Sequence, residues 1–319
     1  MNKSKIEWCD YTWNPCTGCL HGCEYCYARK IANRFKGYTT GGIMNLQEHK
    51  EETKELHVLA KNLWKAPKVL RSTQLNKAPY PFGFDPTFHK YRLIEPFLMN
   101  KPSKIFICSM ADLFGEWVPD EWINEVFQSC STATRHQYLF LTKNPERYDR
   151  ALDYYENEER GFGFSEGLWD NTWFGTTVTC QADNERIWHL SVFSEGHKYL
   201  SVEPLLGEIT LDLTGIQCPK CGSVNVYQDN PVTSKGLPPY YCDDCAEWEG
   251  DNPASCIEWV IVGQQTGPGA VPPKAEWVQS IIDQCKAVGV PVFLKNSLKA
   301  LMGDKFIQEW PEEMDTSNK

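Results

Sequence analysis

Short apolar runs alternate with amphipathic segments along most of this chain, from about residue 69 onward. A short apolar run between polar residues predicts a buried strand, and apolar residues at helical spacing predict a helix. We expect strands at 104–108, 138–141, 173–178, 199–202, 259–262 and 290–294. We expect helices at 119–129, 181–186 and 276–287. Strands that alternate with helices in this way are typical of parallel βα units.

The part of the chain before residue 69 is more polar. Two extended pieces are expected there, at 6–8 and 11–13, and two helices, at 24–36 and 45–64. In the second helix the apolar positions fall at helical spacing: Leu56, Leu59, Ala60 and Leu63. This spacing favours a packing face over a cofactor site.

Eight strands are expected when 11–13 and a strand at 84–88 join the six above. The pattern predicts an α/β fold, a full or partial (β/α) TIM-like barrel, which fills 319 residues as one unit. We place this barrel at 1–212 and 257–319, with an insertion at 213–256. Function in such barrels lies at the carboxyl ends of the strands.

Polar residues follow the apolar runs at most of these strand ends. They are Cys19, Cys23 and Cys26, Ser109, Asp112, Thr142, Lys143, Thr176, Thr177, Glu203, Gln264, Gln265 and Lys295. Any one of them is also explained by an ordinary helix cap or a solvated loop, and we expect that of about half of them. A carboxylate or ammonium group inside a barrel is costly unless it is paired. We therefore expect Glu203, with Lys143 or Lys295, to face a ligand rather than apolar core.

The composition narrows the class of protein. No apolar run approaches the length of a membrane span and no signal peptide is present, so we expect a cytoplasmic protein that does not bind membranes. Fourteen cysteines in such a chain indicate metal rather than disulfides. The net charge of −10 argues against broad binding to nucleic acid but leaves a local basic groove open.

Two cysteine pairs in the insertion have the spacing of a zinc site. They are Cys218 with Cys221 and Cys242 with Cys245. Between the two pairs, the residues at 224–227 and 240–241 predict short strands of a ribbon. Four thiolates close the coordination sphere, so Zn²⁺ here is expected to be structural. Such a ribbon binds nucleic acid or protein, or only stiffens an insertion too small to fold alone.

A second kind of cysteine motif lies near the N-terminus. Cys19, Cys23 and Cys26 follow the pattern C-x3-C-x2-C. Three thiolates on one short loop can hold three irons of a [4Fe–4S] cluster and leave the fourth iron open. A zinc knuckle or a group of buried thiols is the plainer interpretation. The role of Cys16 has two alternatives. As a fourth ligand, Cys16 would close a ferredoxin-like cluster. We expect instead that Cys16 is buried as a small apolar residue.

Residues 19–26 resemble the signature of the radical S-adenosylmethionine (SAM) enzymes, including the aromatic Tyr25 before the last cysteine. The resemblance implies that the open iron chelates SAM, and that reduction cleaves SAM to methionine and a 5′-deoxyadenosyl radical. Further stretches look like an uncharacterised, phage- and mobile-element-associated branch that is distantly similar to spore photoproduct lyase. These stretches are 13–15, 109–114, 141–147, 201–207 and 262–269.

The chain departs from better-known radical SAM families at two places. It lacks a Gly-Gly-Glu-Pro motif after the second strand, and the resemblance implies that Ser109–Asp112 holds the SAM amino group instead. Where this branch has Gly-Gly-Glu-Ser-Gly, the chain has Gly263-Gln264-Gln265-Thr266-Gly267, so an acidic contact is lost.

The resemblance assigns roles to the polar strand ends. Cofactor-binding residues are Tyr25 near the adenine, Ser109, Asp112, Thr142, Thr176 and Gln264. Catalytic candidates are Glu203, Lys143 and Cys180, whose thiol could donate a hydrogen atom, whereas Cys108 is expected in the core. The implied partners are SAM and an electron donor such as flavodoxin or ferredoxin.

The sequence thus predicts a radical SAM enzyme with a [4Fe–4S] cluster and structural zinc. Its substrate is unidentified, and a nucleic acid or nucleotide is the first candidate by analogy alone. The alternative is a zinc-stabilised nucleic-acid-binding or adaptor protein without catalysis. A third reading is an electron carrier whose cluster Cys16 closes.

Overall fold

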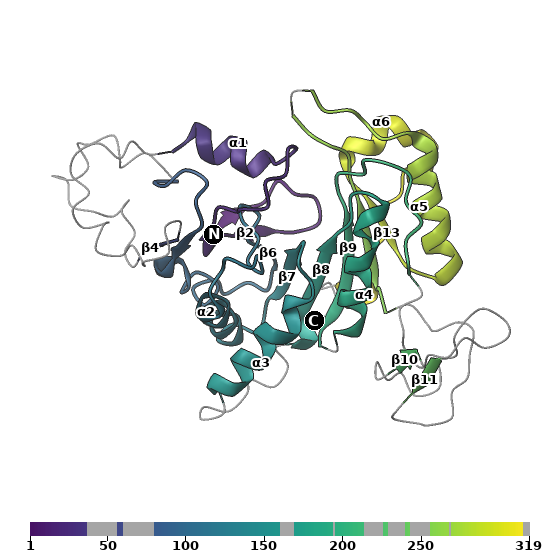
Figure 1. Cartoon of the computed structure of the whole chain (residues 1–319). Helices are drawn as coiled ribbons and strands as arrows, with labels where there is room; N and C mark the ends of the chain where they lie inside the picture. Colours follow the sequence, from purple (N-terminus) through teal and green to yellow (C-terminus); the bar gives the residue numbers. More distant parts are fainter. Residues whose placement is uncertain are drawn as a thin grey trace. The chain divides into compact units, whose positions relative to one another are not determined.

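This computed structural model describes residues 1–36, 56–59, 80–159, 169–193, 195–213, 226–228, 240–242, 256–267 and 269–314 (Figure 1). The chain divides into two compact units, Met1–Thr172 and Trp173–Lys319. The two units correspond to the purple-to-teal and the green-to-yellow parts of Figure 1. Each unit combines a mainly parallel set of strands with helices, which confirms the α/β character that the pattern predicts.

Unit 1 contains four neighbouring strands in the order β1-β2-β6-β7. Their bounds are Asn2–Lys3, Tyr11–Trp13, Lys104–Ile107 and Gln137–Thr142. β2, β6 and β7 run parallel, and β1 pairs antiparallel with β2. Apolar side chains of β6 and β7 are buried, and each large apolar side chain so buried contributes about 1.5–3 kcal/mol. The carboxyl ends of β2, β6 and β7 therefore meet at one edge.

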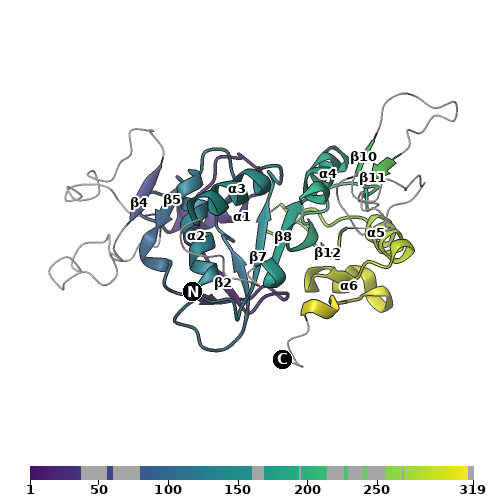
Figure 2. The same ribbon diagram turned by 90° about the horizontal axis from the view of Figure 1, so that it is seen from below.

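Two helices of unit 1, α2 (Asp120–Ser131) and α3 (Arg147–Glu159), lie side by side in both views (Figures 1 and 2). α2 agrees with the expected helix at 119–129, and Pro119 directly precedes it. It buries a face that includes Trp122, Val126 and Phe127. α3 is a helix that the sequence pattern left out.

The N-terminal cysteine loop leads into α1 (Tyr27–Arg34). The helix was expected from residue 24, but Cys26 is its N-cap: the Cys26 Sγ accepts a hydrogen bond from the Arg29 amide at 3.3 Å. Ala28 and Ala32 form the buried face, against Phe84 and Met110. The last cysteine of the loop is thus fixed by the start of a helix.

A separate three-stranded sheet in unit 1 corrects two predictions. Its order is β3-β5-β4, with bounds Cys16–Thr17, Thr87–His89 and His57–Leu59. The strand expected at 84–88 is β5, and counting it as a barrel strand was wrong, because it pairs here. The helix expected over 45–64 is wrong at 57–59, because these residues pair in register with β5 through backbone hydrogen bonds that a helix cannot offer. The rest of that helix lies outside the described residues, apart from Leu56, which is buried.

Unit 2 contains four parallel strands in the order β8-β9-β12-β13. Their bounds are Thr172–Thr177, His197–Val202, Trp259–Val262 and Val292–Leu294. The helices are α4 (Glu185–Val192), α5 (Ala275–Val288) and α6 (Lys299–Met302). The strands agree with the predictions within two residues at each end. The helix expected at 181–186 is a 3₁₀ turn over Gln181–Asn184 that continues into α4.

Other short 3₁₀ turns span Lys90–Arg92, Trp169–Asn171, Asn296–Leu298, Gly303–Lys305 and Glu312–Met314. Among the described helices, none is both long and apolar enough to cross a membrane. The full or partial barrel stays a prediction.

The insertion contains two described strands, β10 (Val226–Gln228) and β11 (Tyr240–Cys242). They pair antiparallel, with Tyr227 opposite Tyr241, and form a sheet of their own. Short strands were expected at these places. Cys218, Cys221 and Cys245 lie outside the described residues, so the zinc site stays a prediction.

Candidate active site

The cysteine loop begins at a glycine that no other residue can replace without movement. Gly18 has a φ of 87°, and a Cβ there would lie 2.2 Å from the backbone oxygen of Asp85. Its amide donates to the Met110 carbonyl at 2.9 Å, and the amide of Cys19 donates to the Phe84 carbonyl at 3.2 Å. The loop therefore starts tightly packed against the segment that follows β6.

The three thiols of the loop differ from most other cysteines in the described part of the chain. Cys19, Cys23 and Cys26 are half-buried, and so is Cys180. The other cysteines with described side chains are buried: Cys9, Cys16, Cys108, Cys130, Cys256 and Cys285. Soft thiol donors on one loop, open to solvent on one side, fit the chemistry of an iron–sulfur site.

No three His, Cys, Asp or Glu side chains of the described residues already converge on one point where a metal ion would sit. The three thiols of the loop fit such a cluster by their chemistry. Burial raises the pKa of the Cys19 thiol to about 12. A bound metal removes that proton, because a coordinating thiol is deprotonated.

The surroundings of Cys16 differ from those of these three thiols. It is in β3, opposite Phe88, and its exposure is 0 %. Burial raises the pKa of this thiol well above its ordinary value, and the nearby Cys108 adds to the rise. Cys16 is thus buried in the core, as expected of a small apolar residue.

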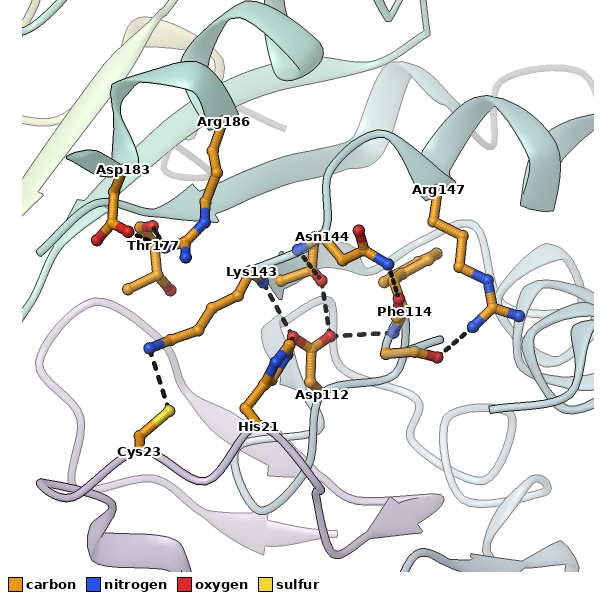
Figure 3. Close-up of polar contacts among 12 residues, drawn as sticks. His21, Cys23, Asp112, Phe114, Lys143, Asn144, Arg147, Thr177, Asp183 and Arg186 are labelled. Carbon is orange, nitrogen blue, oxygen red and sulfur yellow. Dashed lines mark hydrogen bonds and ion pairs between the residues drawn. The ribbon is translucent and has the colours of Figure 1, made fainter. Parts of the chain in front are cut away.

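Asp112, after the end of β6, joins the cysteine loop to the end of β7 (Figure 3). Its Oδ2 accepts from His21 Nε2 at 2.7 Å and from the Lys143 amide at 2.9 Å. Its Oδ1 accepts from the Thr142 hydroxyl at 2.7 Å and from the Phe114 amide at 3.1 Å. The carboxylate is buried, and each of its two oxygens accepts two hydrogen bonds.

These contacts set the charge of Asp112. Burial alone would raise the pKa of its carboxyl, but the hydrogen bond and charge of His21, with the donors from Lys143 and Thr142, hold the pKa below its usual value. The group is therefore a carboxylate at neutral pH. The prediction that Asp112 holds the SAM amino group stays untested, and any such contact would share a carboxylate that already has these four partners.

Lys143, at the end of β7, reaches the cysteine loop with its side chain (Figure 3). Its Nζ donates to the Cys23 sulfur at 3.3 Å and to the Tyr25 hydroxyl, and it lies 4.7 Å from the centre of the Tyr25 ring. An ammonium group beside a sulfur stabilises its thiolate form. Lys143 thus faces the cysteine loop, and its expected contact with a ligand stays a prediction.

Asn14, directly after β2, joins the ends of β2 and β6. Its Oδ1 accepts from the Ser109 hydroxyl at 3.2 Å and from the Met110 amide at 2.9 Å. The Ser109 carbonyl accepts from the Tyr27 hydroxyl at 2.7 Å, at the start of α1. The polar ends of β2, β6 and β7 therefore form one connected hydrogen-bond network with the cysteine loop.

Unit 2 has its own pair of charges at strand ends. Lys295 Nζ, after β13, donates to Glu203 Oε1, after β9, at 2.6 Å, and both side chains are mostly buried. β12 lies between these strands and is followed by Gly263. A Cβ at Gly263 would lie 2.8 Å from the Glu203 Cδ, so glycine leaves the room in which the pair forms. Glu203 thus pairs with Lys295, and the expectation that these side chains face a ligand stays a prediction.

A second polar group in unit 2 follows β8. Asp183 Oδ2 accepts from both the amide and the hydroxyl of Thr179 at 2.7 Å, and its Oδ1 pairs with Arg186 at 2.9 Å. Arg186 also donates to the Thr177 carbonyl at 2.9 Å (Figure 3). Cys180, in this turn, is half-buried.

Two expected cofactor residues of unit 2 differ in exposure. Thr176 is fully buried within β8, whereas Gln264, after β12, is half-buried. Because the side chain of Thr176 is fully buried, Gln264 is the more accessible of the two to a ligand. Both roles stay predictions.

The sequence reasoning missed several residues that the structure places at these ends. His21 lies inside the cysteine motif but drew no role there, and Asn14 was quoted only as part of a motif. Asp183 and Arg186 were also missed. A polar residue directly after a predicted strand was the signal that could have found Asn14, whereas the partner of His21 is 91 residues away and leaves no local pattern.

Comparison with known proteins gives one match. The model of a protein family described as "Protein of unknown function (DUF5131)" matches residues 3–303. No curated protein and no solved structure matches the chain.

Proposed function

This chain belongs to the DUF5131 family, and the description of that family assigns no activity. From the chain's own residues, we propose that it is a radical SAM enzyme. Its [4Fe–4S] cluster is held by Cys19, Cys23 and Cys26, and its substrate is unidentified. When bound, this cluster supplies an open iron for SAM and the electron that cleaves it, which starts radical chemistry on the substrate.

One observation carries the proposal. The half-buried cysteine loop is bonded to the carboxyl ends of β6 and β7 through Asp112 and Lys143. Carboxyl ends of parallel strands are where α/β enzymes place their chemistry. Three thiols lie at such an edge, beside the ammonium group of Lys143 and the buried carboxylate of Asp112. A structural zinc knuckle uses four ligands, so these three donors suit a redox metal centre better.

The chain's own groups have distinct tasks in this proposal. Lys143 donates to the Cys23 sulfur and stabilises its negative charge. Tyr25 contributes an aromatic face beside this cation, and Ser109 and Thr142 hold the turns around it. In unit 2, the Glu203–Lys295 pair and Gln264 offer polar contacts to SAM or substrate, and the Cys180 thiol is the candidate hydrogen donor.

The proposed partners are SAM, a low-potential electron donor such as flavodoxin or ferredoxin, and a nucleic acid or nucleotide substrate. We place the protein in the cytoplasm, with a structural Zn²⁺ on Cys218, Cys221, Cys242 and Cys245. The fold is proposed to be a full or partial (β/α) barrel.

The test is anaerobic reconstitution with iron and sulfide, followed by dithionite and SAM. We expect a [4Fe–4S] absorption and electron paramagnetic resonance spectrum, and 5′-deoxyadenosine as a product. Cys23→Ala should abolish both. A reconstituted protein that yields no cluster, or a cluster without 5′-deoxyadenosine, contradicts the proposal.

The matched control is Cys16→Ala, which should keep the cluster and the product. Loss of the cluster in this variant would instead favour the closed, ferredoxin-like electron carrier. Metal analysis separates the enzyme from the non-catalytic alternative: zinc alone supports a zinc-stabilised adaptor, whereas about four irons and one zinc per chain support the enzyme.

A further inference from the structure

The Asp112 carboxylate is a fixed point beside the cysteine loop. Three of its four donors come from the segment after β6 and from the end of β7: Phe114, Thr142 and Lys143. The Thr142 hydroxyl also accepts from the Asn144 amide at 2.9 Å, and Asn144 donates to the Phe114 carbonyl at 3.0 Å (Figure 3). The carboxylate is thus held in place before the loop contributes anything.

The fourth donor comes from the loop itself. His21 lies between Cys19 and Cys23, and its Nε2 donates to Asp112 Oδ2 at 2.7 Å. The imidazole also packs edge-to-face on Trp117, with ring centres 4.9 Å apart, and its side chain is 23 % exposed. Gly22 follows with a φ of 75°, so the chain turns directly after this contact.

Because of its position in the cysteine motif, His21 can affect two of the three cysteines through its hydrogen bond to Asp112. One residue separates Cys19 from His21, and one separates His21 from Cys23. A residue held on a buried carboxylate at this point restricts the paths that the backbone can take between the two cysteines. Groups that orient metal ligands without binding the metal are worth about 10- to 100-fold in metal affinity.

We propose that His21 is a positioning residue of the cluster site: its hydrogen bond to the buried Asp112 holds the cysteine loop in the conformation that retains the metal. This inference rests on the proposed function for the identity of the metal centre, but the holding of the loop is a property of the metal-free chain as well. His21 itself donates nothing to the metal in this scheme.

The experiment compares three variants with the wild-type full chain after anaerobic reconstitution. His21→Leu removes the donor and keeps an apolar side chain against Trp117. His21→Gln keeps an N–H donor at a similar distance from the backbone, so it should restore the contact with Asp112. Leu20→Ala, at an exposed neighbouring position of the same loop, is the matched control.

The readouts are iron bound per chain and the rate of iron release to a ferrous chelator. His21→Leu should release iron about 10- to 100-fold faster than the wild type, whereas His21→Gln and Leu20→Ala should stay close to it. Release at the wild-type rate from His21→Leu overturns the inference. So does equally fast release from His21→Gln, or from Leu20→Ala.

A second readout uses the metal-free proteins. Alkylation of Cys23 by iodoacetamide, followed by mass spectrometry, should be faster in His21→Leu than in the wild type and His21→Gln. Circular dichroism checks that each variant is folded. If the wild type binds no iron, the proposed function fails while this labelling still tests the loop. If iron binds and both readouts are the same in all variants, only the role of His21 fails.

Discussion

At the scale of single residues, two side chains contact the cysteine loop: Asp112 from the turn after β6 and Lys143 from the end of β7. Asp112 accepts four hydrogen bonds, one of them from His21 of the loop, and Lys143 places an ammonium group 3.3 Å from the Cys23 sulfur. Both contacts act on the loop without needing to bind substrate. They tie the half-buried cysteine loop to the ends of β6 and β7.

Replacing Lys143 by Met should shift the reduction potential of the reconstituted cluster to more negative values. The reason is that hydrogen bonds and positive charge at a cluster sulfur favour the reduced, more negative state. A redox titration followed by electron paramagnetic resonance measures the potential. Lys30→Met, on the exposed part of α1, is the charge-matched control and should leave the potential nearly unchanged. An unchanged potential in Lys143→Met would contradict the contact.

At the scale of elements, strand order decides which side chains meet. Glu203 and Lys295 are 92 residues apart, yet they pair because β9 and β13 flank β12. The absence of a side chain at Gly263 is the condition for this pairing, since the Glu203 side chain lies over that position. Parallel strands thus turn distant positions into one polar edge.

Gly263→Ala should destabilise the protein by about 1–3 kcal/mol, because the added methyl group must push the Glu203 side chain away. Urea unfolding followed by circular dichroism measures the free energy of unfolding. The matched control is Gly207→Ala, because a Cβ at Gly207 meets nothing within 4 Å. Equal stability of the two variants would show that the Glu203–Lys295 pair tolerates the methyl group.

At the scale of the whole molecule, the chain carries two sets of cysteines with different expected metals. The loop near the N-terminus has three, and the insertion has four, of which Cys242 ends β11. Three thiols leave a position for a ligand, whereas four close the sphere of a structural zinc. The two sites are far apart in sequence, so we expect them to load independently.

Cys242→Ser should therefore reduce the zinc content and leave the iron content of the reconstituted protein unchanged. Inductively coupled plasma mass spectrometry gives both metals per chain in one measurement. Cys285→Ser, at a buried cysteine outside both motifs, serves as the comparison for nonspecific loss of structure. Loss of iron together with zinc in Cys242→Ser would show that the two sites are coupled.

Much of the fold could be predicted from local pattern. Strands such as β6, β7 and β12 are apolar runs that are buried on both faces, and this signal is contained in a few consecutive residues. The helix expected over 45–64 failed at β4 because apolar spacing in a short segment fits either element. Pairing with β5, 30 residues away, decided the matter.

The candidate site, too, could be predicted from the sequence only in part. The spacing of Cys19, Cys23 and Cys26 by itself determined which donors lie on one loop, because ligand spacing is a property of consecutive residues. Only the tertiary structure decided that His21 meets Asp112 and that Lys143 faces Cys23. Those contacts depend on which strands are neighbours and on the burial of a carboxylate, and both are set by the packing of segments about 90 to 120 residues apart.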